Sequence, residues 1–214
     1  MKKLVLFDLD GTVLDTQQDI ADCMNMALAD LGYERRSYEE YRKVIGNDAY
    51  NFMRKLLGDL PYEKLLSIWD YYTTFVHKFG TEKTKVFDGV KEALAVLKQR
   101  GYKLVAYTNK TPEENIPFEK KFLHDLNFDL VSAVGGTEDA KPSATGVEKI
   151  LSKFGVSPEN AYLVGDGETD VMTAINAKVN CVAVLWGNRD REFLAQYGAK
   201  VFASTPSELL DLIK

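Results

Sequence analysis

Short apolar runs alternate along the chain with longer stretches in which apolar residues recur every three or four positions. The runs have the length and composition of buried strands, and they occupy residues 4–7, 103–107, 129–134, 161–164, 181–185 and, more weakly, 199–203. The periodic stretches have the spacing of amphipathic helices, as in Val90, Leu94 and Leu97 before Gly101. Alternating strands and helices predict an α/β protein with a Rossmann-like, doubly wound parallel sheet that is covered on both faces.

The stretch from residue 16 to residue 81 departs from this alternation, because it contains helical patterns and no strand pattern. Ile20, Met24 and Leu28 recur at helical spacing, and Ser37 with Glu40 forms the sequence signature of a capping box. We therefore predict an all-helical domain of residues 16–81, inserted into a core of residues 1–15 and 82–214. The hinges are expected at residues 15–16 and 81–85.

Composition and charge exclude several classes of protein. The 214 residues are 45% hydrophobic and carry a formal net charge of −5. A groove for nucleic acid usually needs a basic surplus, so we expect no nucleic-acid partner. No apolar segment approaches membrane-spanning length, so we expect no membrane partner. Cys23 and Cys181 lie far apart in apolar contexts, which favours free thiols over a disulfide framework or zinc site. These features predict a soluble, cytoplasmic protein.

Polar side chains follow four of the predicted strands, at the point where each strand or its loop ends. They are Asp8 and Asp10, Thr108-Asn109-Lys110, Lys141, and Asp166 with Asp170. Ligands bind at the carboxyl edge of open α/β sheets, so we expect these groups to lie together. Several carboxylates, a hydroxyl and a lysine suit a hard, oxygen-loving cation together with a phosphate.

The motif Asp8-Leu9-Asp10-Gly11-Thr12, followed in order by the other three, resembles that of the haloacid dehalogenase-like hydrolases. Within that family the chain is similar to the phosphoglycolate phosphatase-like branch, in which the inserted helical domain forms a small cap. The resemblance covers essentially the whole chain. It implies a Mg²⁺-dependent phosphatase that hydrolyses a small phosphate monoester, with phosphoglycolate as the leading substrate.

The resemblance also implies catalytic roles at the matching positions. Asp8 would be the nucleophile that becomes an aspartyl-phosphate, and a carboxylate needs nearby positive charge to attack a phosphate. Asp10 would act as the general acid and then as the base for water, which requires a protonated fraction. Thr108 would bind the transferring phosphoryl oxygens, and Lys141 would neutralise charge shared by Asp8 and phosphate.

The implied metal site combines Asp8, the main-chain carbonyl of Asp10, and Asp166. Asp170 would bind the Mg²⁺ through water or orient Lys141, since Mg²⁺ commonly keeps several waters. The chain differs from the family pattern next to this site, where Gly167 replaces a common Ser or Thr and Glu168 adds a carboxylate. These differences leave the catalytic groups in place.

Substrate contacts are expected from both domains. Thr108, Asn109 and Lys141 are candidates in the core, and Arg42 and Asn47 near Gly46 are candidates in the cap. A lid over a polar site excludes water and supplies such contacts. The partner is therefore expected to be a small phosphorylated metabolite, and the chain a monomer or homodimer.

Three alternatives remain open at this point. The same core would serve a pyrophosphatase or nucleotide phosphatase. It would also serve a phosphosugar mutase, although similar mutases carry a Ser-Arg pair near the position of Asn47-Asp48. A non-enzymatic binding protein on this scaffold would be expected to lack the nucleophile, the acid or a metal ligand, and all of these are present.

Overall fold

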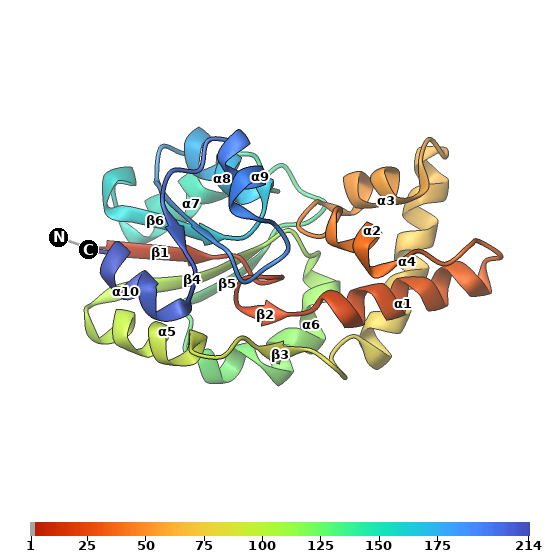
Figure 1. The fold of residues 1–214 in the computed structure, drawn as a ribbon, viewed down its shortest axis with the longest axis horizontal. Coiled ribbons are helices and arrows are strands. Elements are labelled where there is room, and N and C mark those ends of the chain that lie inside the picture. Colours follow the sequence, from red (N-terminus) through yellow and green to blue (C-terminus); the bar gives the residue numbers. More distant parts are fainter. Residues whose placement is uncertain (1–2) are drawn as a thin grey trace.

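The computed structural model describes residues 3–214, and its centre is a six-stranded sheet (Figure 1). The strands lie in the order β5-β4-β1-β6-β7-β8, and each neighbouring pair is parallel. This confirms the predicted Rossmann-like, doubly wound core. The strand bounds are β1 Lys3–Phe7, β4 Tyr102–Thr108, β5 Leu130–Ala133, β6 Ala161–Gly165, β7 Asn180–Val184 and β8 Phe202–Ala203.

Helices cover both faces of the sheet because successive side chains of a strand point to opposite sides. Leu4 and Leu6 of β1 are buried in one apolar cluster with residues of α7 and α8. Val5 and Phe7 are buried in a second cluster with residues of α5 and α6. The core helices are α5 Val90–Gln99, α6 Pro112–Lys121, α7 Thr145–Phe154, α8 Glu168–Asn176, α9 Arg191–Gln196 and α10 Leu209–Leu212, with short 3-10 turns at Leu123–Leu126, Pro158–Asn160 and Pro206–Glu208.

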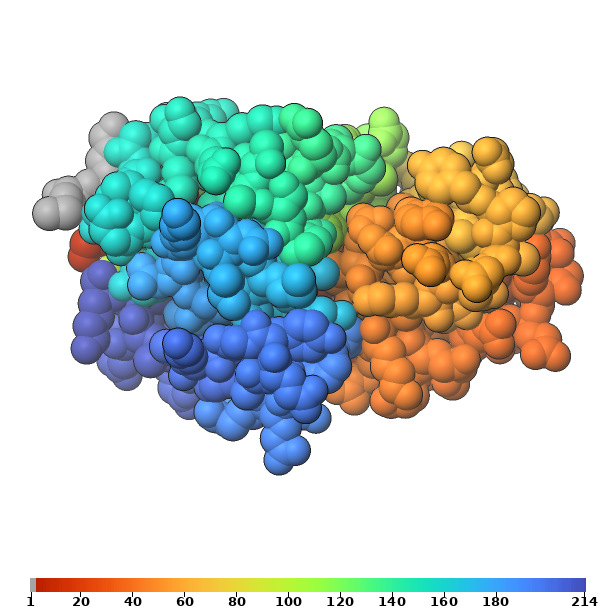
Figure 2. Space-filling view, turned by 90° about the horizontal axis from the view of Figure 1, so that it is seen from above, coloured from red at the N-terminus to blue at the C-terminus, as the bar shows by residue number. Residues whose placement is uncertain are grey.

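Four helices between β2 and β3 gather at one end of the molecule, and the C-terminus lies at the opposite end (Figures 1 and 2). We call this group the cap. Ser37 accepts a hydrogen bond from the backbone of Glu40, and the Glu40 carboxylate accepts one from the Ser37 backbone, so the predicted capping box is confirmed. The bounds are β2 Leu14–Asp15, α1 Gln17–Asp30, α2 Tyr38–Arg42, α3 Ala49–Leu57, α4 Tyr62–Phe79 and β3 Lys85–Val86.

The two connections between cap and core lie side by side, because β2 pairs antiparallel with β3. Asp19, in the first turn of α1, accepts hydrogen bonds from the backbone N–H groups of Lys83 and Thr84 and from the Thr84 hydroxyl. A buried carboxylate of the cap therefore ties down the returning chain. The domain boundaries at 15/16 and 81/82 stay predictions.

Both thiols are unbonded: Cys23 is buried and Cys181 half-buried. Among the helices of residues 3–214, none combines the length and the apolarity needed to cross a membrane. The cytoplasmic location remains a prediction.

Candidate active site

Three neighbouring strands bring the predicted chemical groups to one edge of the sheet. Asp8 follows β1, Thr108 ends β4, and Asp166 follows β6. The strand β1 lies between β4 and β6, and chain order runs in opposite directions on its two sides. Ligands bind at such switch points in open α/β sheets. The sheet topology therefore places these side chains at the expected position.

Three of the carboxylates form a compact buried cluster. Asp8, Asp166 and Asp170 each offer one oxygen, and these oxygens lie within 4.8 Å of one another. Burial, together with the charge of Asp170, raises the pKa of Asp8 to about 7. Burial and the charge of Asp8 raise the pKa of Asp166 to about 6. Such a cluster of carboxylate oxygens is the donor set that a hard divalent cation prefers, so the residues fit the implied Mg²⁺.

Lys141 lies between two members of this cluster. Its Nζ is 2.7 Å from Asp8 Oδ1 and 2.6 Å from Asp170 Oδ1, and the residue is 1% exposed. Burial alone would lower the pKa of Lys141, but the carboxylates of Asp170 and Asp8 outweigh burial and raise that pKa. The other Asp170 oxygen accepts a hydrogen bond from the Gly167 backbone at 3.0 Å. Asp170 therefore contacts Lys141 directly, as the orienting role requires; which of its two expected roles it has stays a prediction.

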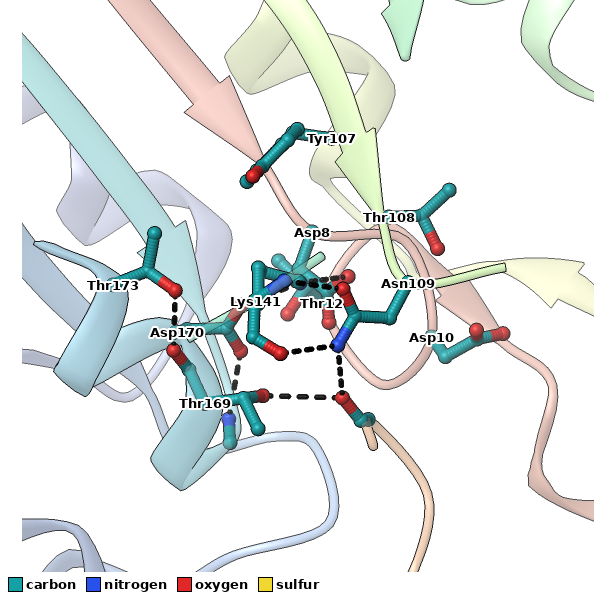
Figure 3. Close-up of polar contacts among 12 residues, drawn as sticks. Asp8, Asp10, Thr12, Tyr107, Thr108, Asn109, Lys141, Thr169, Asp170 and Thr173 are labelled. Carbon is teal, nitrogen blue, oxygen red and sulfur yellow. Dashed lines mark hydrogen bonds and ion pairs between the residues drawn. The ribbon is translucent and has the colours of Figure 1, made fainter. Parts of the chain in front are cut away.

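Asn109 fixes the backbone that carries Lys141 (Figure 3). Its Oδ1 accepts from the Lys141 N–H at 2.7 Å, and its Nδ2 donates to the Lys141 carbonyl at 3.0 Å. The same Nδ2 lies 3.1 Å from the carbonyl of Gly46 in the cap. Asn109 is a predicted substrate ligand, but in this structure both the oxygen and the nitrogen of its side-chain amide are hydrogen-bonded to the protein's own backbone.

Asp166 is held by three hydrogen bonds. Thr12 donates to Oδ1 at 3.0 Å, and the backbone and side chain of Asn188 donate to Oδ2 at 2.6 and 2.9 Å. Gly11 packs against this carboxylate with a φ of +83°, and a Cβ there would lie 2.3 Å from Asp166 Oδ2. Only glycine satisfies both the backbone conformation and the close approach.

The side chain of Asp10 lies apart from the carboxylate cluster (Figure 3). The Thr16 hydroxyl donates to Asp10 Oδ1 at 2.5 Å, and Lys110 Nζ lies 2.8 Å from Oδ2. The cluster of carboxylate oxygens formed by Asp8, Asp166 and Asp170 does not include this side chain. Among the described residues, a contribution of Asp10 to a metal site would therefore have to come from its main chain, which is the role that the family resemblance implies and which stays a prediction.

Lys110 extends the site toward the cap. Its Nζ lies 3.6 Å from Glu114 Oε1 and 4.5 Å from the ring centre of Phe118. The hydroxyl of Tyr72, on cap helix α4, donates to the same Glu114 oxygen at 3.4 Å. Burial raises the pKa of Glu114, while Lys110 opposes this rise. Sequence reasoning placed Glu114 in the first turn of a helix that begins after Thr111, but Lys110 precedes that helix, so no local pattern indicated their pairing.

A cavity lies between the carboxylates and the cap. The core side contributes Asp8, Asp10 and the predicted phosphoryl ligand Thr108, and the cap side includes the predicted substrate ligand Asn47. The cavity volume is about 20 Å³, and one water molecule needs roughly 10–15 Å³. The cap is therefore closed over the site, and a phosphate ester enters only when cap or side chains move. The full lining is Asp8, Asp10, Ile20, Ile45, Gly46, Asn47, Phe52, Trp69, Tyr72, Thr108, Asn109, Lys110 and Glu114.

The cap contacts the site directly through the carbonyl of Gly46. That oxygen accepts from Asn109 Nδ2 and from Thr169 Oγ1, both at 3.1 Å (Figure 3). Asn109 follows β4, and Thr169 lies in the first turn of α8 beside Asp170. The two core elements that carry catalytic candidates therefore hold the same cap residue.

A buried arginine of the core makes a second tie to the cap. Arg189 donates to the carbonyls of Arg42 and Lys43 at the end of α2, and its Nε lies 3.1 Å from Glu168 Oε2. Lys55 of α3 lies 3.6 Å from the other oxygen of Glu168. Glu168 thus serves the cap contact and lies outside the carboxylate cluster of the described residues. No motif in the sequence indicates Arg189.

Arg42 is not placed where a substrate ligand is expected. Among residues 3–214 it does not line the cavity at Asp8, and its guanidinium instead donates to the Asn188 carbonyl at 3.2 Å. The reason is that α2 ends against the loop carrying Asn188 and Arg189, which directs Arg42 along the cap–core boundary. In this structure Arg42 is a boundary residue, and a substrate contact would require it to move.

Comparisons with known proteins agree with this geometry. Residues 5–184 match the family described as haloacid dehalogenase-like hydrolase. The chain is 33% identical over 191 residues to a phosphoglycolate phosphatase from Aquifex aeolicus, covering 86% of this chain and 85% of the relative. It is 29% identical over 212 residues to the pyrophosphatase PpaX from Bacillus cereus, covering 98% and 95%.

A solved structure shows the same architecture. The crystal structure of a predicted phosphatase from Clostridium acetobutylicum matches with a TM-score of 0.87 and 25% identity, covering 100% of this chain and 98% of that one. The matched region includes every strand end that carries a candidate catalytic group. Sequence, fold and site together show that this chain is an enzyme of the haloacid dehalogenase-like hydrolase family.

Proposed function

We propose that the protein is a Mg²⁺-dependent phosphatase that hydrolyses a small phosphate monoester through an aspartyl-phosphate on Asp8. The observation that carries this proposal is the buried cluster of Asp8, Asp166 and Asp170 with Lys141 inserted into it. Attack on a phosphoryl group requires a nucleophilic carboxylate, ligands for a cation and a lysine held in place.

In the first step, a carboxylate oxygen of Asp8 attacks phosphorus and the bond to the alcohol oxygen breaks. Lys141, 2.7 Å from Asp8, neutralises part of the charge that accumulates between Asp8 and the phosphoryl group. The Thr108 hydroxyl lines the cavity and is available to donate to a phosphoryl oxygen. Asn109 keeps Lys141 in place through its backbone.

Asp10 supplies and removes the protons. Its carboxyl group gives a proton to the departing alcohol oxygen and later takes one from the water that hydrolyses the aspartyl-phosphate. Lys110 Nζ, 2.8 Å from Asp10 Oδ2, and the Thr16 hydroxyl hold the Asp10 carboxyl group in place for both proton transfers.

The residues that would hold Mg²⁺ are Asp8, Asp166 and the main-chain carbonyl of Asp10, with Asp170 acting through water or through Lys141. When bound, Mg²⁺ supplies the positive charge that lets a carboxylate approach a phosphate dianion. Thr12 and Asn188 keep Asp166 oriented for that role.

The cap encloses the reaction and limits substrate size. We propose that residues 16–81 move as a unit against residues 1–15 and 82–214, with the β2–β3 pair as the connection. The cap covers Asp8 and Asp10 with its own side chains and the chain carries a net charge of −5, so the partner we propose is a small phosphorylated metabolite rather than nucleic acid. Phosphoglycolate and pyrophosphate, named for the two relatives, are the first compounds to test.

The test is phosphate release from a panel of small phosphate esters, nucleotides and pyrophosphate, with Mg²⁺ and with chelator. We expect Mg²⁺-dependent release by the wild type and none by Asp8→Asn. Asp129→Asn, which neutralises a carboxylate away from the site, should retain activity. Release by Asp8→Asn, or release that survives the chelator, would contradict the proposal. Product analysis with a hexose 1-phosphate separates a mutase from a phosphatase.

A further inference from the structure

The wall that the cap contributes to the cavity is largely apolar. Ile20, Ile45, Phe52, Trp69 and Tyr72 line it, and among the cap residues of the described chain no Lys or Arg does so. Placing a charged group against apolar surface is costly unless an opposite charge accompanies it. The part of a substrate that lies beyond its phosphoryl group therefore meets no positive charge from the closed cap.

The two buried lysines of the core are each already paired with two carboxylates. Lys110 lies 2.8 Å from Asp10 and 3.6 Å from Glu114. Lys141 contacts Asp8 and Asp170 at 2.7 and 2.6 Å. Neither lysine has an uncompensated charge for a second anionic group on the substrate.

Two buried polar atoms of the cavity residues have no hydrogen-bond partner within residues 3–214. They are Glu114 Oε2 and Trp69 Nε1, on residues that are 3% and 7% exposed. Both residues line the cavity, and Tyr72 packs beside each of them: its ring centre is 4.9 Å from that of Trp69, and its hydroxyl donates to the other Glu114 oxygen, Oε1. Buried polar groups are nearly always hydrogen-bonded, so these two atoms indicate a ligand that both donates and accepts.

A hydroxyl group meets both requirements. It donates to a carboxylate oxygen while it accepts from an indole N–H. When Glu114 is ionised, a substrate carboxylate or second phosphoryl group accepts from Trp69 but offers no proton to Glu114, and the two negative charges repel. When Glu114 is protonated it can donate to such an anion, but the anion still has no positive partner against the apolar wall. In neither protonation state does Glu114 provide a positive charge.

We infer that the substrate is the phosphate monoester of a small uncharged alcohol whose further hydroxyl binds between Glu114 and Trp69. The inference rests on the proposed phosphatase function and specifies its substrate class. It favours a neutral leaving group over phosphoglycolate and pyrophosphate, both of which bring additional negative charge.

Three esters of nearly equal size test this inference. In 2-hydroxyethyl phosphate the second carbon carries a hydroxyl, in phosphoglycolate the corresponding carbon is a carboxylate, and ethyl phosphate has neither group. We expect kcat/KM for 2-hydroxyethyl phosphate to exceed that for the other two by at least about tenfold, since a site built to bind a hydroxyl rejects analogues that lack it. Pyrophosphate is the fourth compound and should be the poorer substrate as well.

Single substitutions assign the preference to residues. Glu114→Gln keeps the shape and an acceptor but removes the charge, so the preference over phosphoglycolate should fall by about tenfold. Trp69→Phe removes the N–H and should reduce the preference over ethyl phosphate. Tyr71→Phe is the matched control, because it removes a hydroxyl from the neighbouring position of α4 that donates to Asp30 outside the cavity, and both substrate ratios should persist.

The outcomes separate this inference from the proposed function. If neither the four compounds nor the wider panel is hydrolysed in a Mg²⁺-dependent reaction, the proposed phosphatase function is refuted. Hydrolysis in which phosphoglycolate, ethyl phosphate or pyrophosphate equals or exceeds 2-hydroxyethyl phosphate would overturn the inference and leave the phosphatase intact. If Glu114→Gln fails to fold, as judged by circular dichroism, the wild-type ratios decide the matter alone.

Discussion

The buried carboxylate cluster destabilises the metal-free protein, and Asp8→Asn measures the size of that effect. The pKa of Asp8 is raised from an ordinary 3.8 to about 7, chiefly by burial and then by Asp170. The folded state therefore holds this proton more tightly than the unfolded chain. The stability associated with neutral Asp8 is fully present below pH 3.8 and is lost as the pH rises to about 7.

This pKa difference corresponds to about 4 kcal/mol in the free energy of unfolding. Asparagine has nearly the shape of aspartate without the charge, and Lys141 retains Asp170 at 2.6 Å. In chelator at pH 8, Asp8→Asn should therefore be more stable than the wild type by about 4 kcal/mol. The difference should be much smaller at pH 5, where wild-type Asp8 is neutral in the folded state.

Urea unfolding followed by tryptophan fluorescence provides the measurement, at several pH values between 5 and 8 in chelator. The series is then repeated with Mg²⁺, which should stabilise the wild type by about 2.7 kcal/mol at a hundredfold excess over Kd. Asp8→Asn lacks one ligand and should gain less.

The control reverses the sign of the effect. Burial alone would raise the pKa of Asp129, but hydrogen bonds from Lys103 and Lys98 outweigh it and lower that pKa to about 2. Asp129→Asn should therefore destabilise the protein throughout pH 5–8, because the carboxylate is the stabilised form. The reasoning about Asp8 is refuted if Asp8→Asn is no more stable than the wild type at pH 8, or if the difference does not change with pH.

Two further experiments, one of them with a control variant, test how the site is assembled. Thr169→Val removes the hydroxyl that donates to the Gly46 carbonyl, so cap closure should weaken by about 1 kcal/mol and KM should rise about fivefold. Thr173→Val removes another buried hydroxyl, one turn further along α8, and should leave KM unchanged; equal KM values for the two variants would remove the argument for this contact. Gly11→Ala places a Cβ against Asp166 and should abolish Mg²⁺-dependent activity while circular dichroism shows the fold retained, so full activity in this variant would contradict the close packing.

The sequence placed the catalytic candidates correctly at the edge of the sheet, because the relevant signals are local. The run before Asp8 is apolar on both faces, which identifies a strand buried on both sides, and Gly11 marks its end. The helical repeat of Ile20 and Met24 likewise identifies the cap. Hydrophobic periodicity depends on the chain's own geometry and needs no information about distant residues.

The details of the cap contact could not be derived in this way. Arg42 and Asn47 are equally plausible ligands in the sequence, yet only Asn47 lines the cavity. The position of Arg42 depends on the loop at Asn188, which is far away in the chain. A helix repeat shows which face of α2 is buried, but it does not show which core loop meets its end.

Local patterns in the chain predicted the doubly wound core, the inserted helices and the order of the four motifs, since strand and helix periods and turn residues are encoded within each segment. The grouping of the charges, by contrast, follows from three-dimensional packing: Asp166 and Asp170 join Asp8 around Lys141, whereas Asp10 pairs with Lys110. Charge interactions depend on separations of a few ångströms between residues distant in the chain. Those separations are set by the packing of the whole sheet and cap, which no local pattern specifies.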